Sequence, residues 1–262
     1  MLQNGNGLNG GKPLTRTQIK KLKRKGLLQD ITIREIEQLD QIRQSGLQIK
    51  HIKPKTINQN SIFEAYNNNK QLLIHGYPGT GKTFLALYLS INSVQNKIFN
   101  KIVIVRSAVP TRNMGFLPGK VNQKTEEYEA PYSAIFAELF NRGDAYQILK
   151  NRGIAEFMST SYVRGITLHD CIVIVDESQN MSYHELRSII TRLGNNCKII
   201  FCGDLYQSDF IYEDEKHGFK QMMKILSDMN EFAIIKMDVN DIVRSGLVKS
   251  FILAESKNPI HE

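Results

Sequence analysis

The sequence predicts an α/β fold in which a parallel β-sheet is covered by helices on both faces. Two observations predict it: short, almost continuously apolar segments recur along the chain, and segments with helical spacing lie between them. Strands that are apolar along their whole length are typical of parallel sheets buried on both faces. Pro54 and the change of composition around it place the boundary of this unit near His51, so we expect one domain over residues 51–262.

The elements follow in order along the chain. Apolar runs predict strands, and amphipathic spacing predicts helices after the first, third and fourth of them. The expected strands are 72–75, 102–105, 171–175, 198–202 and 232–236, and the expected helices are 83–94, 183–193 and 217–229. Residues 107–168 interrupt the alternation with prolines and glycines around an amphipathic stretch at 132–150. We expect an insertion there, either a substrate-binding element or a helical buttress.

Residues 1–50 form a basic N-terminal extension. Gly- and Asn-rich residues 1–13 predict disorder, and helical spacing at 15–25 and 31–45 predicts two short helices. Residues 1–58 hold 12 Lys and Arg against 4 Asp and Glu, whereas residues 59–262 hold 22 of each, so the net charge of +8 lies in the N-terminal part. The cationic run at 20–25 is suited to nucleic-acid phosphates; a solvated tail or a partner-docking helix explains it equally well.

Composition restricts the location that we expect. No apolar run approaches the roughly 18 residues of a membrane span, and the N-terminus has no apolar signal core. The chain has an odd number of cysteines, and these lack C-x-x-C spacing, so we expect reduced thiols at Cys171, Cys197 and Cys202. These features predict a cytoplasmic protein without a membrane partner, and no metal other than nucleotide-borne Mg²⁺.

Residues 76–83 read G-Y-P-G-T-G-K-T directly after the first apolar strand and fit G-x-x-x-x-G-K-[ST]. Gly76 and Gly81 allow backbone amides to approach phosphates, Lys82 reaches the β- and γ-phosphates, and Thr83 supplies a hydroxyl for Mg²⁺. We expect the whole loop to bind the nucleotide, including Tyr77, Pro78, Gly79 and Thr80. The predicted fold class is therefore the P-loop NTPase fold, with a RecA-like parallel sheet flanked by helices.

Two carboxylates end the strand at 171–175. Asp176 is expected to hold Mg²⁺, and Glu177, one residue on, can polarise the water that attacks the γ-phosphorus. An acidic pair after a strand is a weak signal alone, but together with the phosphate loop it predicts hydrolysis as well as binding. The following Ser178-Gln179-Asn180 gives D-E-x-Q, a pattern of helicases and related motors.

Two glutamines are candidates for reading the nucleotide. Gln207 follows the strand at 198–202 and can sense the γ-phosphate, although a plain turn is the alternative. Gln59 both donates and accepts, as the adenine edge requires, with a helix cap as its alternative. The sequence contains no N-K-x-D of the guanine-reading kind, which favours ATP.

Phosphoryl transfer also needs positive charge near the γ-phosphate. Arg106, Arg164 and Arg244 lie at predicted strand ends or loops. Arg244 is the first choice, acting on its own nucleotide or on that of a neighbouring subunit, and a surface salt bridge is its alternative.

Eight ordered blocks together resemble the PhoH-like ATPase family, whose core is similar to that of superfamily-one helicases. They lie at 54–59, 76–83, 103–110, 115–119, 163–168, 176–180, 203–207 and 241–248. The G-F-L-P-G block at 115–119 and the D-E-S-Q-N block at 176–180 are the most distinctive. The resemblance covers residues 50–255 and implies assembly into a ring such as a hexamer, with an arginine supplied across the interface. It also suggests a bacteriophage source, hence a host cytoplasm.

The leading hypothesis from the sequence is an Mg²⁺-dependent ATPase coupled to RNA or single-stranded nucleic acid, with RNA helicase as its most specific form. The alternative is a nucleotide-gated binding or regulatory protein with slow ATPase activity, which docks partners through the basic N-terminal helices. A small-molecule kinase is a weaker third option, because the sequence offers no signature for its acceptor site.

Overall fold

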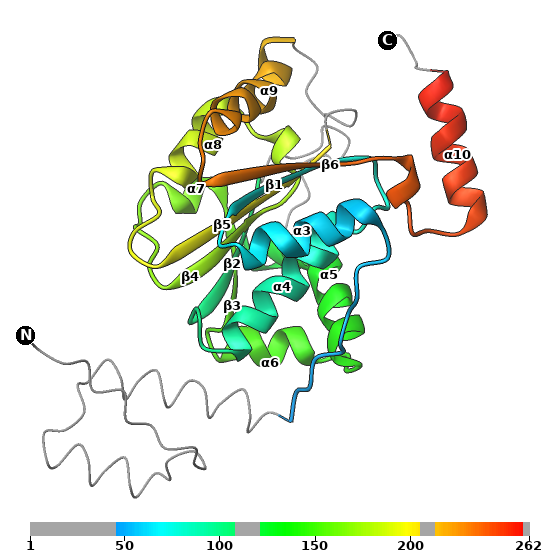
Figure 1. Ribbon diagram of the computed structural model, residues 1–262. Helices are drawn as coiled ribbons and strands as arrows, with labels where there is room; N and C mark the ends of the chain where they lie inside the picture. The colour runs from blue at the N-terminus through cyan, green and yellow to red at the C-terminus, as the bar shows by residue number, and fades with distance from the viewer. Residues whose placement is uncertain (1–45, 108–120, 205–212, 259–262) are drawn as a thin grey trace, which may run out of the picture.

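The computed structural model of the chain describes residues 46–107, 121–204 and 213–258 (Figure 1). Its centre is a six-stranded sheet in the order β3-β2-β4-β5-β1-β6, and every neighbouring pair of strands is parallel. The strands are β1 (Gln71–Gly76), β2 (Lys101–Arg106), β3 (Ala155–Ser159), β4 (Cys171–Val175), β5 (Cys197–Gly203) and β6 (Phe232–Met237). The predicted parallel sheet is thus confirmed, and five of its strands lie where the apolar runs placed them.

The central strands are buried on both faces, as their continuous apolar character predicts. All five residues of β4 are buried. Ile172 and Ile174 pack in the core on one face, whereas Val173 packs in the core on the other. This alternation follows from the two-residue period of a strand, so an apolar residue at every position supplies both cores.

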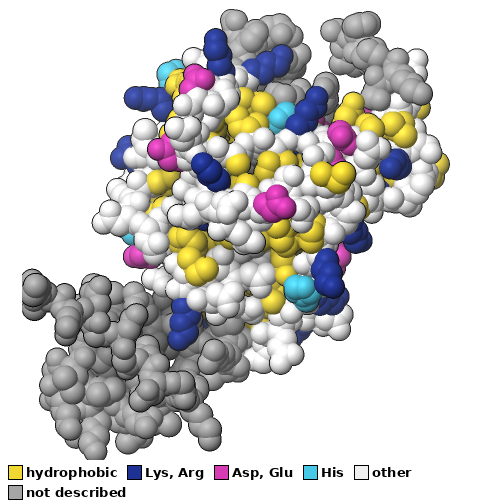
Figure 2. Space-filling model, in the orientation of Figure 1, with side chains coloured by type: hydrophobic (Ala, Val, Ile, Leu, Met, Phe, Trp, Pro, Cys, Tyr) yellow, Lys and Arg dark blue, Asp and Glu magenta, His cyan; other side chains and the backbone are white. Residues whose placement is uncertain are grey.

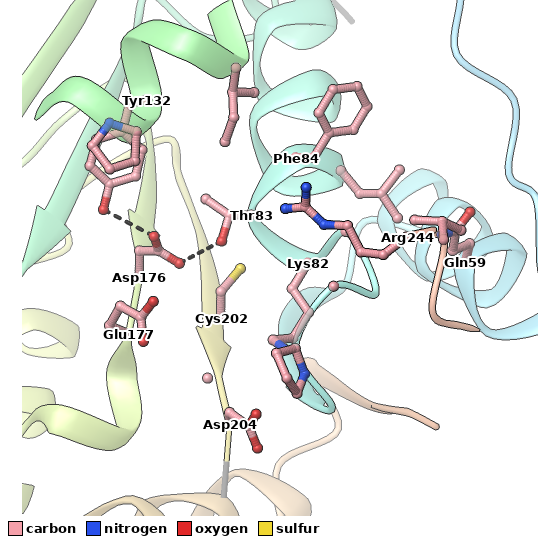
Figure 3. A pocket seen from close by; sticks show the side chains of 18 of the residues that line it. Gln59, Lys82, Thr83, Phe84, Tyr132, Asp176, Glu177, Cys202, Asp204 and Arg244 are labelled. Carbon is pink, nitrogen blue, oxygen red and sulfur yellow. Dashed lines mark hydrogen bonds between the residues drawn. The ribbon is translucent and has the colours of Figure 1, made fainter. Parts of the chain in front are cut away.

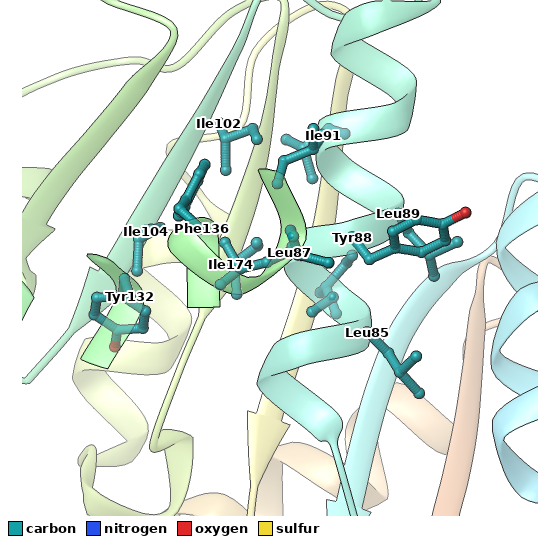
Figure 4. Packing of buried hydrophobic residues seen from close by; sticks show 14 of the residues in the cluster. Leu85, Leu87, Tyr88, Leu89, Ile91, Ile102, Ile104, Tyr132, Phe136 and Ile174 are labelled. Atoms are coloured by element: carbon teal, nitrogen blue, oxygen red, sulfur yellow. The ribbon is translucent and has the colours of Figure 1, made fainter. Parts of the chain in front are cut away.

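Helices cover the two faces of the sheet (Figure 1). On one face lie α3 (Ile57–Asn67), α4 (Lys82–Gln95), α5 (Val121–Phe140) and α6 (Ala145–Asn151), and on the other lie α7 (Thr160–Val163), α8 (Tyr183–Ile190) and α9 (Glu213–Ser227). Figure 4 shows Leu87 of α4 and Phe136 of α5 facing Ile174 of the sheet in the first core. The last helix, α10 (Gly246–Lys257), stands beside this body, after β6.

The segment at 107–168 differs from the expected insertion, because it contributes β3 to the edge of the sheet. β3 pairs with β2 from Ile102 opposite Ala155 to Arg106 opposite Ser159. Only the first of its five residues is fully buried, so its sequence lacks the apolar run that marks a central strand. Helix α5 of this segment packs on the sheet through Phe136, as the buttress alternative predicts.

Several element ends differ from the predictions by a few residues. α8 starts after a capping box between Ser182 and Glu185 and ends at Ile190, three residues earlier than expected. The predicted helices at 15–25 and 31–45 lie outside the described residues. Just after them, Leu47 is buried in the first core, and the Lys50 backbone N–H donates to the Leu139 carbonyl of α5 (2.8 Å). Within the described ranges, each helix is too short or too polar to cross a membrane.

The strand order decides where the chemistry lies. β5 is placed between β1, which leads into the phosphate loop, and β4, which leads into Asp176 and Glu177. Because all three strands are parallel, their carboxyl ends lie on the same edge of the sheet. The loop residues 76–83, the acidic pair and Asp204 are therefore brought together from distant parts of the sequence.

Candidate functional site

A cavity of about 660 Å³ opens at the carboxyl ends of β1, β5 and β4 (Figure 3). Its walls come from the phosphate loop, from the ends of these strands, from α5 and from the segment between β6 and α10. Among the predicted site residues, those that line it are Gln59, Pro78, Gly79, Gly81, Lys82, Thr83, Asp176, Glu177, Arg106 and Arg244.

The phosphate loop has a backbone that its glycines make possible. Gly79 and Gly81 have φ angles of 73° and 86°, in the left-handed region that glycine adopts without steric cost. Gly81 is the N-cap of α4 and provides no side-chain acceptor for the first helical N–H groups. These amides and the positive end of a 14-residue helix consequently point toward the cavity, an arrangement suited to a phosphate.

Lys82 lies inside this loop. Its ammonium donates to the carbonyl oxygens of Gly76 (2.6 Å) and Tyr77 (2.8 Å). Burial lowers the pKa of Lys82, and the charge of Asp204 is the largest effect that opposes the shift. The lysine therefore carries its charge at the site at an energetic cost that an anionic ligand would relieve.

Thr83 and Asp176 meet across the cavity. The Thr83 hydroxyl donates to Asp176 Oδ1 (2.7 Å), and the Tyr132 hydroxyl of α5 donates to Asp176 Oδ2 (3.0 Å) (Figure 3). Asp176 is buried, and desolvation raises its pKa above the ordinary value, with the charge of Glu177 as the second cause. A hydroxyl and a carboxylate are oxygen ligands that Mg²⁺ prefers, so this pair fits a magnesium ion.

Tyr132 keeps its proton in this environment. Burial raises its pKa well above the ordinary value, and the negative charge of Asp176 adds to the shift. A neutral phenol can only donate to the carboxylate here. Tyr132 was not identified from the sequence as a site residue, because a tyrosine in an amphipathic helix has the spacing of an ordinary core residue.

Glu177 leaves β4 in a left-handed conformation, with φ 50° and ψ 40°. Its carboxylate accepts from Gln179 Nε2 (2.6 Å), while Gln179 Oε1 accepts from the backbone N–H of Asp204 (2.9 Å). Gln179 thereby connects the ends of β4 and β5. A non-glycine residue in this region costs about 1 kcal/mol or more and is a feature that functional sites often carry.

Gln59 lies at the third position of α3 and is almost fully buried. Its amide oxygen accepts from the Lys55 backbone N–H (2.8 Å), and its amide nitrogen donates to the Thr80 carbonyl (3.2 Å). The N-cap of α3 is Thr56, whose hydroxyl accepts from the Gln59 backbone N–H (3.2 Å), so Gln59 is not itself the helix cap. Its role in reading adenine stays a prediction.

The three candidate arginines lie in different places. Arg244 lies on its own phosphate loop: a Cβ added to Gly79 would come within 2.8 Å of Arg244 Cγ, and Val243 N–H donates to the Gly79 carbonyl (3.1 Å). Arg106 also lines the cavity, with its guanidinium carbon 5.9 Å from the centre of the Tyr128 ring. Arg164 is exposed after α7 and is not among the lining residues.

A buried carboxylate holds the Arg244 segment in place. Asp241 is 1% exposed and accepts from the Thr56 hydroxyl, from Asn58 Nδ2 (2.8 Å) and from the Asp238 backbone N–H (2.7 Å). These contacts join the N-terminal end of α3 to the segment before α10. Asp241 stands in one of the blocks that carry the family resemblance, but that block alone does not indicate its partners.

The other predicted residues are placed as follows. Gly76 and Tyr77 adjoin the cavity through the two carbonyls that Lys82 contacts, and Thr80 is fully buried with its hydroxyl on the Tyr77 carbonyl (2.8 Å). Gln207 lies outside the described residues. Cys202 and Asp204 also line the cavity, and neither was predicted from the sequence as a site residue. The three cysteines are free thiols, as expected.

A family model described as PhoH-like protein matches residues 51–255. The chain belongs to the PhoH-like protein family. This PhoH-like chain is 35% identical over 210 residues to the PhoH-like protein of Bacillus subtilis (strain 168), a match that covers 79% of the chain and 65% of the relative. It is 31% identical over 231 residues to the PhoH-like protein of Mycobacterium leprae (strain TN), covering 87% and 64%. The family predicted from the ordered blocks is confirmed.

The PhoH-like chain spans just under two thirds of the length of these two relatives. Among solved structures, it is similar to the UvsW helicase of bacteriophage T4, with a TM-score of 0.44 and 18% sequence identity. That match covers 85% of this chain and 77% of the helicase chain.

Proposed function

We propose that this PhoH-like chain binds ATP with Mg²⁺ and hydrolyses it. The observation that carries the proposal is the hydrogen bond between Thr83 and Asp176, two residues 93 positions apart that meet beside Lys82 and the glycine loop. A phosphate loop, a lysine and an acidic oxygen pair in one cavity are the parts that phosphoryl transfer requires.

Each residue then has a task that its position supports. The loop amides and Lys82 bind the phosphates, and Thr83 with Asp176 would hold Mg²⁺, which neutralises charge on the phosphate oxygens when bound. Glu177 would accept a proton from the attacking water, because its carboxylate lines the cavity directly after Asp176 and Gln179 fixes one of its oxygens. Arg244 or Arg106 would stabilise the charge that develops on the γ-phosphate.

We further propose that hydrolysis is coupled to RNA or single-stranded nucleic acid. The excess of basic residues before position 59 supports this, because phosphate contacts dominate the affinity for nucleic acid. On the face seen in Figure 2, basic and acidic side chains of the described residues are interspersed. We expect RNA to stimulate ATP turnover, and stimulation to weaken between low and high salt.

The experiment is a measurement of ATP turnover with and without RNA or single-stranded DNA, at two salt concentrations. A matched chain in which Lys20, Lys21, Lys23, Arg24 and Lys25 are changed to Gln tests the basic run. If nucleic acid stimulates ATP turnover by wild type but not by this variant, the result supports coupling of hydrolysis to nucleic acid through the basic run. Turnover that no nucleic acid changes under any condition would favour the second candidate, a nucleotide-gated binding protein with slow hydrolysis.

We also propose that the chain forms a homo-oligomer, in which a ring of six is the form that the family resemblance suggests. Leu247 and Phe251 of α10 are 82% and 63% exposed, and they follow Arg244 closely. Exposed apolar residues of this size on one helix are typical of contact surfaces. Native mass with and without ATP tests the assembly, and a mass that stays that of one chain for wild type would contradict it.

A further inference from the structure

Both oxygens of the Asp176 carboxylate accept hydrogen bonds from hydroxyl groups of other elements. Thr83 of α4 donates to one oxygen (2.7 Å) and Tyr132 of α5 donates to the other (3.0 Å) (Figure 3). Thr83 belongs to the phosphate-binding sequence, whereas no part of that chemistry requires a tyrosine. Tyr132 is therefore a polar contact of the site that the proposed function leaves unexplained.

The phenol of Tyr132 is held rigidly by its surroundings. The residue is 1% exposed, and its ring lies 5.9 Å from the ring of Phe157 in β3. Phe136, one turn further along α5, is fully buried in the same core. Packing fixes the ring, and the ring in turn fixes where its hydroxyl donates.

We propose that Tyr132 is a positioning residue that sets the orientation of Asp176 for a divalent cation. A carboxylate turns about a single bond, so one hydrogen bond leaves it free to present either oxygen. With Oδ2 held by Tyr132, Oδ1 stays beside the Thr83 hydroxyl, so that Oδ1 and the hydroxyl oxygen would both be available to one cation. Partners that orient a metal-binding carboxylate typically change metal affinity by about 10–100-fold when they are removed.

This inference rests on the proposed function, because it assumes that Thr83 and Asp176 hold Mg²⁺. It also explains the placement of α5. The helix forms part of the cavity wall, and Tyr132 contacts the edge strand β3 through the ring of Phe157 and the end of β4 through its hydrogen bond to Asp176.

The test compares Tyr132→Phe with Tyr146→Phe. Tyr146 is a matched control: it is also buried, and its hydroxyl donates to a buried carboxylate, Glu129 (2.8 Å), which does not line the cavity. Both variants lose one hydroxyl and keep the ring, so their melting temperatures should fall by similar amounts. Binding of Mn²⁺ to each chain with a non-hydrolysable ATP analogue is measured by electron paramagnetic resonance, and the Mg²⁺ concentration for half-maximal ATP turnover is measured in parallel.

We expect Tyr132→Phe to weaken Mn²⁺ binding about tenfold or more and to raise the half-saturating Mg²⁺ concentration by a similar factor. Turnover at saturating Mg²⁺ should stay within a few-fold of wild type, and Tyr146→Phe should match wild type in both measurements. If Tyr132→Phe folds and binds Mn²⁺ as wild type does, the positioning role is wrong while the proposed function stands. If wild type itself binds no Mn²⁺ with the ATP analogue, both proposals are wrong.

Discussion

The hydroxyl of Thr83 donates to Asp176 Oδ1 at 2.7 Å, which joins the first turn of α4 to the end of β4. The contact exists because β1 and β4 are parallel strands separated only by β5, so the residues after them share one edge of the sheet. A hydroxyl and a carboxylate at this distance provide two oxygens for one cation.

Thr83→Val should therefore weaken metal binding while the chain still folds. The side chain keeps its shape but loses the hydroxyl, so we expect Mg²⁺-dependent ATP binding to weaken by about tenfold or more, as for other losses around metal sites. Thr83→Ser keeps the hydroxyl and is the matched control, expected to stay within a few-fold of wild type. Fluorescent ATP-analogue titrations with Mg²⁺ and with EDTA measure both. Equal affinity for all three chains in Mg²⁺ would show that the hydroxyl has no part in cation binding.

Gly76 is required by the close approach of β6. Its φ is 128°, and a Cβ there would overlap the carbonyl oxygen of Met237. Gly76→Ala should lower the free energy of unfolding by about 3 kcal/mol or more, from backbone strain and overpacking together. Gly153 has φ 68° but nothing within 4 Å of an added Cβ, so Gly153→Ala should lose only about 1 kcal/mol. Urea denaturation compares them, and equal losses would contradict the packing argument.

Asp241 is expected to matter for both stability and nucleotide affinity. Asp241→Ala removes the acceptor for Thr56, Asn58 and the Asp238 N–H, which should cost about 2–4 kcal/mol of unfolding free energy. Because Asp241 fixes the segment that places Arg244 on Gly79, ATP affinity should fall as well. Asp241→Asn keeps one acceptor oxygen and should show smaller effects in urea denaturation and ATP titration. If the Asp241→Ala chain is destabilised but binds ATP as wild type does, the hydrogen bonds of Asp241 have no part in nucleotide binding.

The buried side chain of His75 should make the free energy of unfolding depend on pH. Burial, with a further contribution from Lys236 and Lys82, lowers its pKa from 6.5 to about 4. The unfolded chain therefore takes up a proton at higher pH than the folded chain, so stabilisation present above pH 6.5 is lost as the pH falls toward 4. His75→Gln should flatten the difference in unfolding free energy between pH 7 and pH 4.5, and an unchanged slope would contradict the assignment.

The sequence was sufficient for the parts of this protein that depend on local pattern. β4 was predicted residue for residue, because five consecutive apolar residues bounded by polar ones indicate a central strand. β3 was missed, because an edge strand needs no continuous apolar run. At the site, the phosphate loop and the acidic pair have fixed spacing and were identified, and they line one cavity.

The contacts between distant elements were beyond the sequence. Tyr132 has the helical spacing of a core residue, and its hydrogen bond to Asp176 depends on how α5 crosses the sheet. Asp241 likewise looks like a turn residue until Thr56 and Asn58 are seen beside it. Gln59 was predicted from the sequence to read adenine, whereas in the structure its amide contacts Lys55 and Thr80 of the same chain.

The central claim is that Glu177 turns nucleotide binding into hydrolysis, and Glu177→Gln tests it most directly. The amide cannot accept the proton of the attacking water, so turnover should fall by about 100-fold or more while ATP affinity stays within a few-fold of wild type. Glu138→Gln is the control, because Glu138 is an exposed carboxylate lining the same cavity. Single-turnover hydrolysis and ATP-analogue binding are measured for both variants. Full turnover by a Glu177→Gln chain that binds ATP would contradict the account.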